Sequence, residues 1–140
     1  MVKVRYLLDT NVLSEPLRPY PSPRLMELLS RAADSVATAA PVWHELQFGA
    51  SRLRPSKRRR LIESYLVDVV RTTMPILPYD ERAAHWHAVE RARLVAAGRT
   101  PPFVDGQIAA IAVVNDLVLV TANVADYEPF AGLTVENWNE

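Results

Sequence analysis

Apolar residues occur along this chain as short continuous runs that alternate with stretches at helical spacing. The continuous runs predict buried strands over residues 2–8, 35–39, 74–77 and 117–121, with a last small strand over 133–135. The helical spacings predict helices over 25–33, 41–49, 55–70, 81–97 and 106–114, and a short helical or turn segment over 123–130. Strands that alternate with helices in this order predict an α/β domain with a mainly parallel sheet.

Individual residues predict where several helices begin and end. Asp80 is placed to cap the helix over 81–97, and Gly98 is placed to end it. Asp105 is expected to open the helix over 106–114, where it would cap the first turn. In the helix that starts at Pro55 and Ser56, the apolar residues from Leu61 to Val70 are expected to form one face.

The length and composition favour one globular domain over residues 1–140. The chain has 140 residues, of which 49% are hydrophobic and 23% charged, as in ordinary globular proteins. It has no cysteine, which excludes disulfide scaffolds, thiolate zinc sites and cysteine nucleophiles. The first apolar run stops at Asp9, too early for a signal peptide, and no apolar stretch approaches the roughly 20 residues of a membrane helix. We therefore expect no membrane association and a cytoplasmic location.

The charges balance to zero but are unevenly placed. Six basic residues lie between positions 52 and 60, namely Arg52, Arg54, Lys57, Arg58, Arg59 and Arg60, and no Lys or Arg follows Arg99. This basic run is a solvated surface, a contact for RNA phosphates, or a surface for an acidic partner. We favour a protein partner or dimer surface, because the run follows the helix that carries Glu45 and is expected to point away from that helix's active-site end.

Four polar residues are candidates for chemistry at the edge of the predicted sheet. Ligands of open parallel sheets bind beyond the carboxyl ends of strands, which selects Asp9 and Asn123. Glu45 and Asp105 lie near the starts of helices and could point to the same edge. Simpler roles remain open: a turn for Asp9, a solvent-facing carboxylate for Glu45 and a helix cap for Asp105.

Three converging carboxylates would repel one another and would need a cation. Oxygen ligands without cysteine favour Mg²⁺ or Mn²⁺, and such an ion can activate water against a phosphodiester. The sequence has no glycine-rich phosphate loop, no Gly-x-Ser-x-Gly elbow and no zinc-protease His pair. Phosphodiester hydrolysis is therefore the favoured reaction class.

Four motifs in this order resemble the PIN-domain ribonucleases, and within them the VapC/FitB-like toxins of toxin–antitoxin pairs. The motifs are residues 7–15 (LLDTNVLSE), 44–50 (HELQFGA), 104–110 (VDGQIAA) and 119–123 (LVTAN) with Asp126 and Tyr127. The resemblance implies a three-layer α/β/α fold, a Mg²⁺ or Mn²⁺ site of one or two ions, and endonuclease action on RNA. It also implies a homodimer that is inhibited by a small antitoxin.

The resemblance assigns roles to particular residues. Asp9, Glu45 and Asp105 match the first three acids of the family, and Asn123 matches a fourth position where many members have Asp. Asp126 is the alternative for that fourth position. Three further residues match supporting groups that orient carboxylates or water, namely Thr10, Asn11 and Thr121.

Other functions are weaker matches. A receiver-like module needs a late lysine, and no lysine follows Lys57. An Asp-dependent phosphatase needs a second acid where this chain has Asn11. A catalytically silent PIN-like binding module stays open, although the three acids together argue against it.

Overall fold

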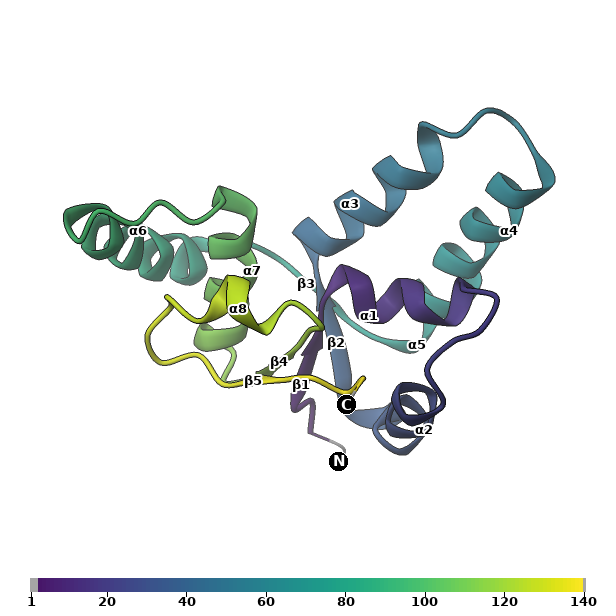
Figure 1. Ribbon diagram of the computed structural model, residues 1–140, viewed down its shortest axis with the longest axis horizontal. Helices are drawn as coiled ribbons and strands as arrows, with labels where there is room; N and C mark the ends of the chain where they lie inside the picture. The colour runs from purple at the N-terminus through teal and green to yellow at the C-terminus, as the bar shows by residue number, and fades with distance from the viewer. Residues whose placement is uncertain (1–2, 140) are drawn as a thin grey trace.

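Five parallel strands form one sheet in the computed structural model, which describes residues 3–139 (Figure 1). The strands are β1 (Tyr6–Leu8), β2 (Val36–Ala39), β3 (Ile76–Leu77), β4 (Val118–Val120) and β5 (Val135–Glu136). Their spatial order is β3-β2-β1-β4-β5, with Leu8 paired to Thr38 on one side and to Val120 on the other. Strands β2 and β3 thus add on one side of β1, and β4 and β5 add on the other. The point where strand addition reverses therefore lies between β1 and β4 in the sheet.

Helices cover both faces of this sheet. They are α1 (Thr10–Ser14), α2 (Pro23–Arg31), α3 (Ala40–Ser51), α4 (Lys57–Tyr65), α5 (Arg71–Thr73), α6 (Glu81–Ala96), α7 (Phe103–Val114) and α8 (Val124–Tyr127). In Figure 1, α1 to α5 lie on one side of the strands and α6 to α8 on the other. This arrangement confirms the three-layer α/β/α fold. No helix in the described part of the chain is both long and apolar enough to cross a membrane.

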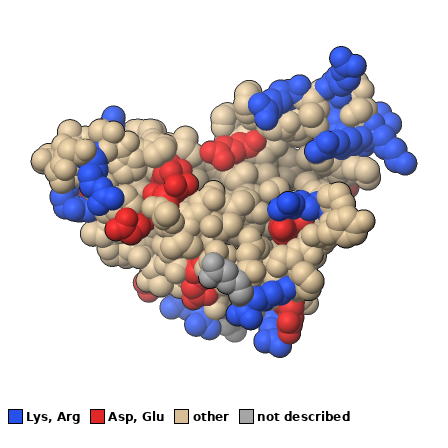
Figure 2. All heavy atoms as spheres, in the orientation of Figure 1, with Lys and Arg blue, Asp and Glu red and all other residues tan. Residues whose placement is uncertain are grey.

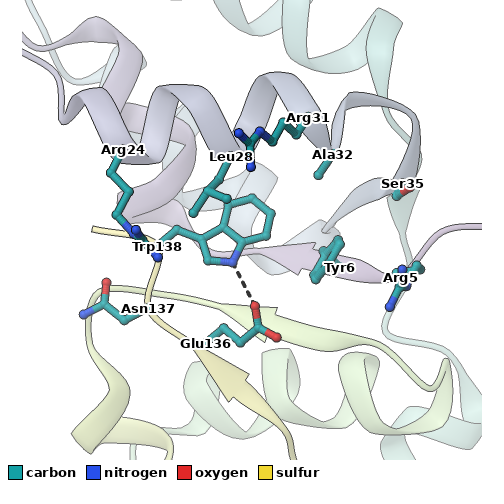
Figure 3. Close-up of a pocket in the computed structure, with 10 residues that line it drawn as sticks. All are labelled: Arg5, Tyr6, Arg24, Leu28, Arg31, Ala32, Ser35, Glu136, Asn137 and Trp138. Carbon is teal, nitrogen blue, oxygen red and sulfur yellow. Dashed lines mark hydrogen bonds between the residues drawn. The ribbon is translucent and has the colours of Figure 1, made fainter. Parts of the chain in front are cut away.

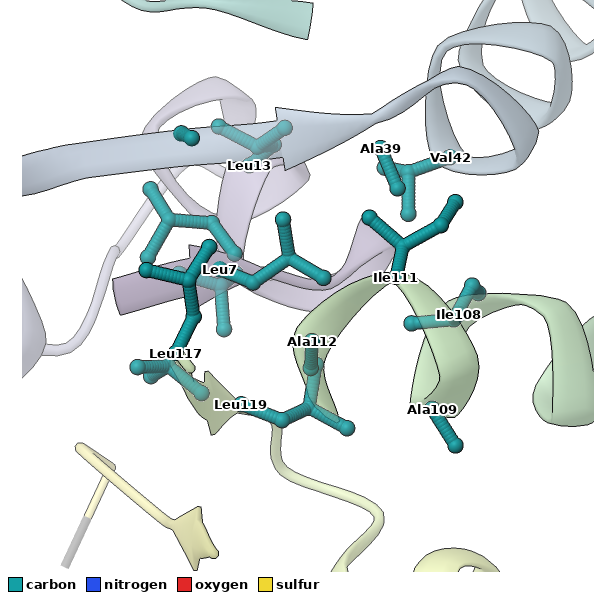
Figure 4. Packing of buried hydrophobic residues seen from close by; sticks show 14 of the residues in the cluster. Leu7, Leu13, Ala39, Val42, Ile108, Ala109, Ile111, Ala112, Leu117 and Leu119 are labelled. Atoms are coloured by element: carbon teal, nitrogen blue, oxygen red, sulfur yellow. The ribbon is translucent and has the colours of Figure 1, made fainter. Parts of the chain in front are cut away.

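The hydrophobic core includes buried residues of the strands, of α1, α2 and α3 on one side of the sheet, and of α7 on the other. Figure 4 shows its part around β1, β4 and α7. Leu7, Leu119 and Ile111 are fully buried there. Burying such a side chain contributes roughly 1.5–3 kcal/mol. The central strand and α7 thereby become a rigid support for the residues at their ends.

The start of α7 differs from the prediction. The helix begins at Phe103, so Asp105 lies inside its first turn and is not its cap. Pro102 takes the N-cap position without a side-chain hydrogen bond. Proline has no backbone N–H to satisfy and a φ already close to helical, so it can precede a helix without a capping side chain.

Three further elements depart from the prediction. The pattern did not reveal α1, because five residues are too few for helical periodicity to be visible. The helix after Ser56 continues through a π turn (Leu66–Val70) into α5. The apolar face expected there is interrupted: Leu61 is 60% exposed and Val69 46% exposed. The first strand, β1, begins at Tyr6 and is therefore shorter than predicted. Residue 2, where the predicted strand starts, lies outside the described residues.

A tryptophan near the C-terminus covers the sheet beneath α2 (Figure 3). The Trp138 ring meets Tyr6 edge-on at 5.0 Å between ring centroids, and its indole N–H donates to Glu136 Oε1 at 3.0 Å. The hollow around it, about 420 Å³, is also lined by Arg5, Arg24 and Arg31. This hollow contains none of the candidate active-site residues.

Candidate active site

The candidate residues meet in a cavity of about 360 Å³ at the carboxyl edge of the sheet. Its lining is Asp9, Thr10, Asn11, Ser14, Glu45, Asp105, Ile108, Asn123, Asp126 and Tyr127. In Figure 2 acidic side chains lie on both sides of the notch between α3 and the α7–α8 side of the molecule. Residues far apart in the sequence are thus brought together at the point where strand addition reverses, as expected for this class of sheet.

Asp9 is the most firmly held of these acids. It follows β1 directly and is 5% exposed. Its Oδ1 accepts from the Thr10 N–H at 2.8 Å, which caps α1. Its Oδ2 accepts from the Thr121 hydroxyl at 2.9 Å and from the Tyr127 hydroxyl at 3.2 Å. These three hydrogen bonds fix the orientation of the Asp9 carboxylate.

Thr121 and Asn11 form the support beneath Asp9. The Thr121 hydroxyl donates to Asp9 and accepts from Asn11 Nδ2 at 3.1 Å and from the Asn123 N–H at 3.0 Å. These three contacts use the full hydrogen-bonding capacity of a hydroxyl. The Asn11 side-chain oxygen accepts from the Ala122 N–H at 2.9 Å. The end of β4 is therefore tied to α1 around the Asp9 carboxylate.

Glu45 reaches the same cavity from the first half of α3. Its side chain is exposed. Its Oε2 accepts from the Thr10 hydroxyl at 2.9 Å. Thr10 therefore connects two acids, because its N–H contacts Asp9 and its hydroxyl contacts Glu45.

Asp105 has the most perturbed carboxyl of the cavity. Its pKa is raised to about 6, first by burial and then by the negative charges of Asp126, Asp9 and Glu45. Mutual repulsion of this kind is expected when carboxylates gather without a cation. The acids are thus close enough to influence one another electrostatically.

Asn123 and Asp126 both face the cavity from the beginning of α8. Asn123 is the N-cap residue, and Asp126 lies in the first turn. Both side chains are exposed. The geometry therefore offers both an amide oxygen and a carboxylate for the fourth position.

The donor set fits a hard divalent cation. Carboxylate and amide oxygens are the ligands that Mg²⁺ and Mn²⁺ prefer. Within residues 3–139, no three His, Cys, Asp or Glu side chains are already arranged as ligands of one ion. The exposed side chains of Glu45 and Asp126 have the freedom to turn toward Asp9, whose own position is fixed.

Tyr127 lines the cavity and contacts Asp9, although no functional role is predicted for it from the sequence. It is buried, and burial together with the charges of Asp9, Asp105 and Glu45 raises the pKa of its hydroxyl. Its hydroxyl therefore stays protonated and donates to Asp9. Its place next to Asp126 in the last motif is the only signal the sequence carries for it.

The basic run lies over the end of α3 and the start of α4, where Lys and Arg side chains gather in Figure 2. The expectation that the whole run faces away from the acids does not hold for Arg58. Arg58 lines a hollow of about 510 Å³ together with Thr10, Ser14 and Glu45. The α3–α4 turn folds back, so a residue after the helix can still reach the groove beside Glu45.

Comparison with known proteins agrees with this geometry. The family model described as the PIN domain matches residues 6–125. The chain belongs to the PIN-domain family. Toxin FitB of Neisseria gonorrhoeae is 33% identical over 124 residues, covering 86% of this chain and 89% of that protein. The tRNA(fMet)-specific endonuclease VapC of Shigella flexneri is 26% identical, covering 97% of this chain and 99% of that protein.

Solved PIN-domain structures share the whole fold. FitAB bound to an IR36 DNA fragment has a chain that matches with a TM-score of 0.88 at 29% identity, covering 96% of each chain. FitAcB from Neisseria gonorrhoeae matches with a TM-score of 0.86 at 32% identity, covering 94% of this chain and 96% of that chain. The similarity therefore extends over nearly all of this PIN domain.

Proposed function

We propose that this PIN-domain protein is a metal-dependent endoribonuclease, the toxin of a toxin–antitoxin pair. The observation that carries the proposal is the cavity in which Asp9, Glu45, Asp105, Asn123 and Asp126 meet. Burial, followed by the negative charges of Asp126, Asp9 and Glu45, raises the pKa of Asp105, and a divalent cation would relieve the repulsion among these acids. Relatives named as VapC ribonucleases and the FitB toxin support the same reaction class.

The ion of this site is, in our proposal, Mg²⁺ or Mn²⁺. Asp9, Glu45 and Asp105 would hold it, with the fourth ligand from Asn123 or Asp126. Such an ion, when bound, would supply an activated water molecule and stabilise negative charge on a phosphate oxygen. The donor chemistry of the cavity supports this choice, because every candidate ligand is an oxygen.

The residues of the chain prepare the site in distinct ways. Thr121, Tyr127 and the Thr10 N–H orient Asp9 before any substrate arrives. Such pre-organisation lowers the free energy that is needed to reach the reactive geometry. Thr10 holds Glu45 toward the cavity through its hydroxyl. Asn11 joins α1 to the end of β4 and so keeps the two sides of the site together.

The partners follow from the same proposal. RNA is the substrate, and a small antitoxin is the inhibitor. The hollow lined by Leu17, Leu46 and Ile62 together with Arg18 and Arg58 is suited to an apolar and acidic protein segment. We further propose that residues 1–140 form a single domain, that the protein is a homodimer and that it acts in the cytoplasm.

The test is metal binding and RNA cleavage by matched variants. Asp9→Asn and Asp105→Asn are expected to abolish cleavage of single-stranded RNA in Mg²⁺ or Mn²⁺ and to weaken ion binding measured by calorimetry. Asp34→Asn, an exposed aspartate outside the cavity, is the control and is expected to behave as the wild type.

Circular dichroism of each variant must show an intact fold. Wild-type rates in either cavity variant would refute the assigned mechanism. Absence of ion binding and of cleavage in the wild type would instead favour a silent PIN-like binding module.

A further inference from the structure

The acid cavity is the middle of a longer groove. Asp105 and Asp126 line both the acid cavity and a neighbouring hollow of about 400 Å³. On the other side, Thr10, Ser14 and Glu45 line both the acid cavity and the hollow of about 510 Å³ that contains Arg58. Because neighbouring hollows share lining residues, the three lie side by side and together form what we call the groove.

The charges along this groove change sign twice. Arg18 and Arg58 lie at one end and Arg99 at the other, with the carboxylates between them. A single RNA strand carries one negative charge per nucleotide and is repelled by carboxylates except where a cation intervenes. A strand whose reacting phosphate lies over the acids would therefore place its flanking phosphates near the arginines.

The Arg99 end has a second property that suits a nucleotide. We call it the Arg99 hollow, formed by Arg99, Thr100, Pro101, Pro102, Ala125 and Pro129 beside Asp105 and Asp126. Three prolines give it rigid apolar surface without backbone N–H groups. Pro101 and Pro129 are only partly exposed. A base or ribose can pack on such a surface with little loss of protein conformational entropy.

The backbone that carries Arg99 is fixed. Gly98 has a φ of +78° at the end of α6, a conformation that glycine adopts without steric cost. The Arg99 N–H then bonds the Leu94 carbonyl at 2.8 Å, which closes the helix in a Schellman arrangement. Arg99 therefore leaves α6 in a defined direction toward α8.

The Arg99 guanidinium can exchange its ion-pair partner Glu128 for another anion. Its partner is Glu128 at 3.7 Å, and both side chains are largely exposed. Exposed ion pairs of this kind contribute little to stability. An RNA phosphate, which accepts paired hydrogen bonds from arginine, can replace Glu128 at small cost.

We propose that the Arg99 hollow is the subsite for the nucleotide next to the cleaved phosphodiester. Its base or ribose packs on the prolines, the Thr100 hydroxyl bonds a polar edge of the nucleotide, and Arg99 holds the adjacent phosphate. The inference rests on the proposed ribonuclease function. It adds that this hollow reads the flanking nucleotide, so it contributes to the choice of RNA sequence.

The test pairs protein variants with abasic RNA. A single-stranded oligonucleotide that the wild type cuts once is made with an abasic nucleotide at either position beside the cut. For one position the wild type is expected to lose about 5- to 100-fold in kcat/KM, the range for a lost base contact. In the Pro102→Ser and Thr100→Ala variants, the abasic RNA is expected to lower kcat/KM by a clearly smaller factor, because these variants have already weakened the contact with the base. Serine is a common N-cap residue, so Pro102→Ser keeps the start of α7.

Arg99 is tested by binding in the cleavage-deficient Asp9→Asn background. Adding Arg99→Ala is expected to weaken oligonucleotide binding about tenfold and to lower the salt dependence by about 0.7 log units. Arg71→Ala is the charge-matched control, since Arg71 is exposed and lies outside the groove lining. That control is expected to bind as its parent does.

Three results would contradict the subsite or the function on which it rests. If the abasic change costs the same fold in the wild type, Pro102→Ser and Thr100→Ala, the hollow does not hold the nucleotide. If these variants alter only inhibition by a protein partner, the hollow belongs to that partner and the inference is overturned. If the wild type cuts no RNA, the proposed function fails, and the binding series still decides whether Arg99 and its hollow contact RNA.

Discussion

Asp105 is a cavity carboxyl whose pKa is raised by the fold. Its ordinary pKa of 3.8 rises to about 6 in the folded protein, first through burial and then through Asp126, Asp9 and Glu45. Between these two values the folded protein binds more protons at this carboxyl than the unfolded chain does. The free energy of unfolding therefore falls as the pH rises through that window, and Asp105 destabilises the metal-free protein at neutral pH.

Asp105→Asn is accordingly expected to stabilise the metal-free protein. The increase in the free energy of unfolding should be absent below about pH 4, grow toward pH 6 and then stay constant. Because Asp105 is only partly buried, we discount the shift for solvent screening and expect about 1–2 kcal/mol. Urea unfolding in a chelator from pH 4 to pH 7 measures it, with Asp34→Asn as the exposed control. Parallel pH profiles of wild type and Asp105→Asn would contradict the expectation.

At the scale of elements, the contact between α6 and α7 determines where Asp105 lies. His87 of α6 is 3% exposed, and its Nδ1 is 2.8 Å from the Tyr79 hydroxyl. Its ring packs against Phe103 at 4.7 Å between centroids. A Cβ on Gly106 would lie 2.2 Å from His87 Nε2. Glycine next to Asp105 therefore allows the imidazole to reach the backbone of α7.

Gly106→Ala is expected to destabilise the protein by about 1–3 kcal/mol, because His87 must leave its position. Chemical denaturation measures the change, and RNA cleavage is expected to fall with it because the first turn of α7 shifts. Adding His87→Ala opens the space, so Gly106→Ala should cost less in that background.

Gly49→Ala provides the matched control. Gly49 also lies within a helix, but nothing lies within 4 Å of its added Cβ. Alanine there is expected to stabilise α3 by up to about 1 kcal/mol. Equal effects of the two substitutions would show that His87 does not constrain α7.

At the scale of the whole molecule, charge is separated between the α3–α4 end and the acid cavity (Figure 2). The basic run is not uniform. Arg59 bonds the Leu53 carbonyl at 2.9 Å and Glu63 at 3.2 Å, so it stabilises the start of α4. Arg58 lines the groove. Arg54, Lys57 and Arg60 are exposed and lie outside the groove lining, which makes them the members to test as a partner surface.

We expect the triple variant Arg54→Ala/Lys57→Ala/Arg60→Ala to keep RNA cleavage and the salt dependence of RNA binding. Its association with an acidic antitoxin is expected to slow about tenfold at low salt, because complementary charge mainly accelerates encounter. Stopped-flow association and RNA binding across salt concentrations measure both. A drop in the RNA salt slope of about 0.7 per lost contact would assign these residues to RNA instead.

The order of strands and helices could be predicted from the sequence because apolar periodicity is a local property. The run before Asp9 and the run before Thr121 each predict a buried strand without knowledge of the rest of the chain. The same patterns placed Asp9 and Asn123 at strand ends and Glu45 in a helix, and the family motifs selected those residues with Asp105. Local patterns and family motifs together therefore indicated the four main candidates of the site.

The tertiary structure decided the contacts between these segments. The hydrogen bonds of Asp9 to Thr121 and Tyr127 join residues 112 and 118 positions apart. They depend on the pairing of β4 with β1 and on the placement of α8, which no local pattern encodes. The approach of Arg58 to Glu45 likewise depends on how α4 folds back along α3. Periodicity determines which face of an element is buried, whereas the distance between two side chains depends on how whole elements pack.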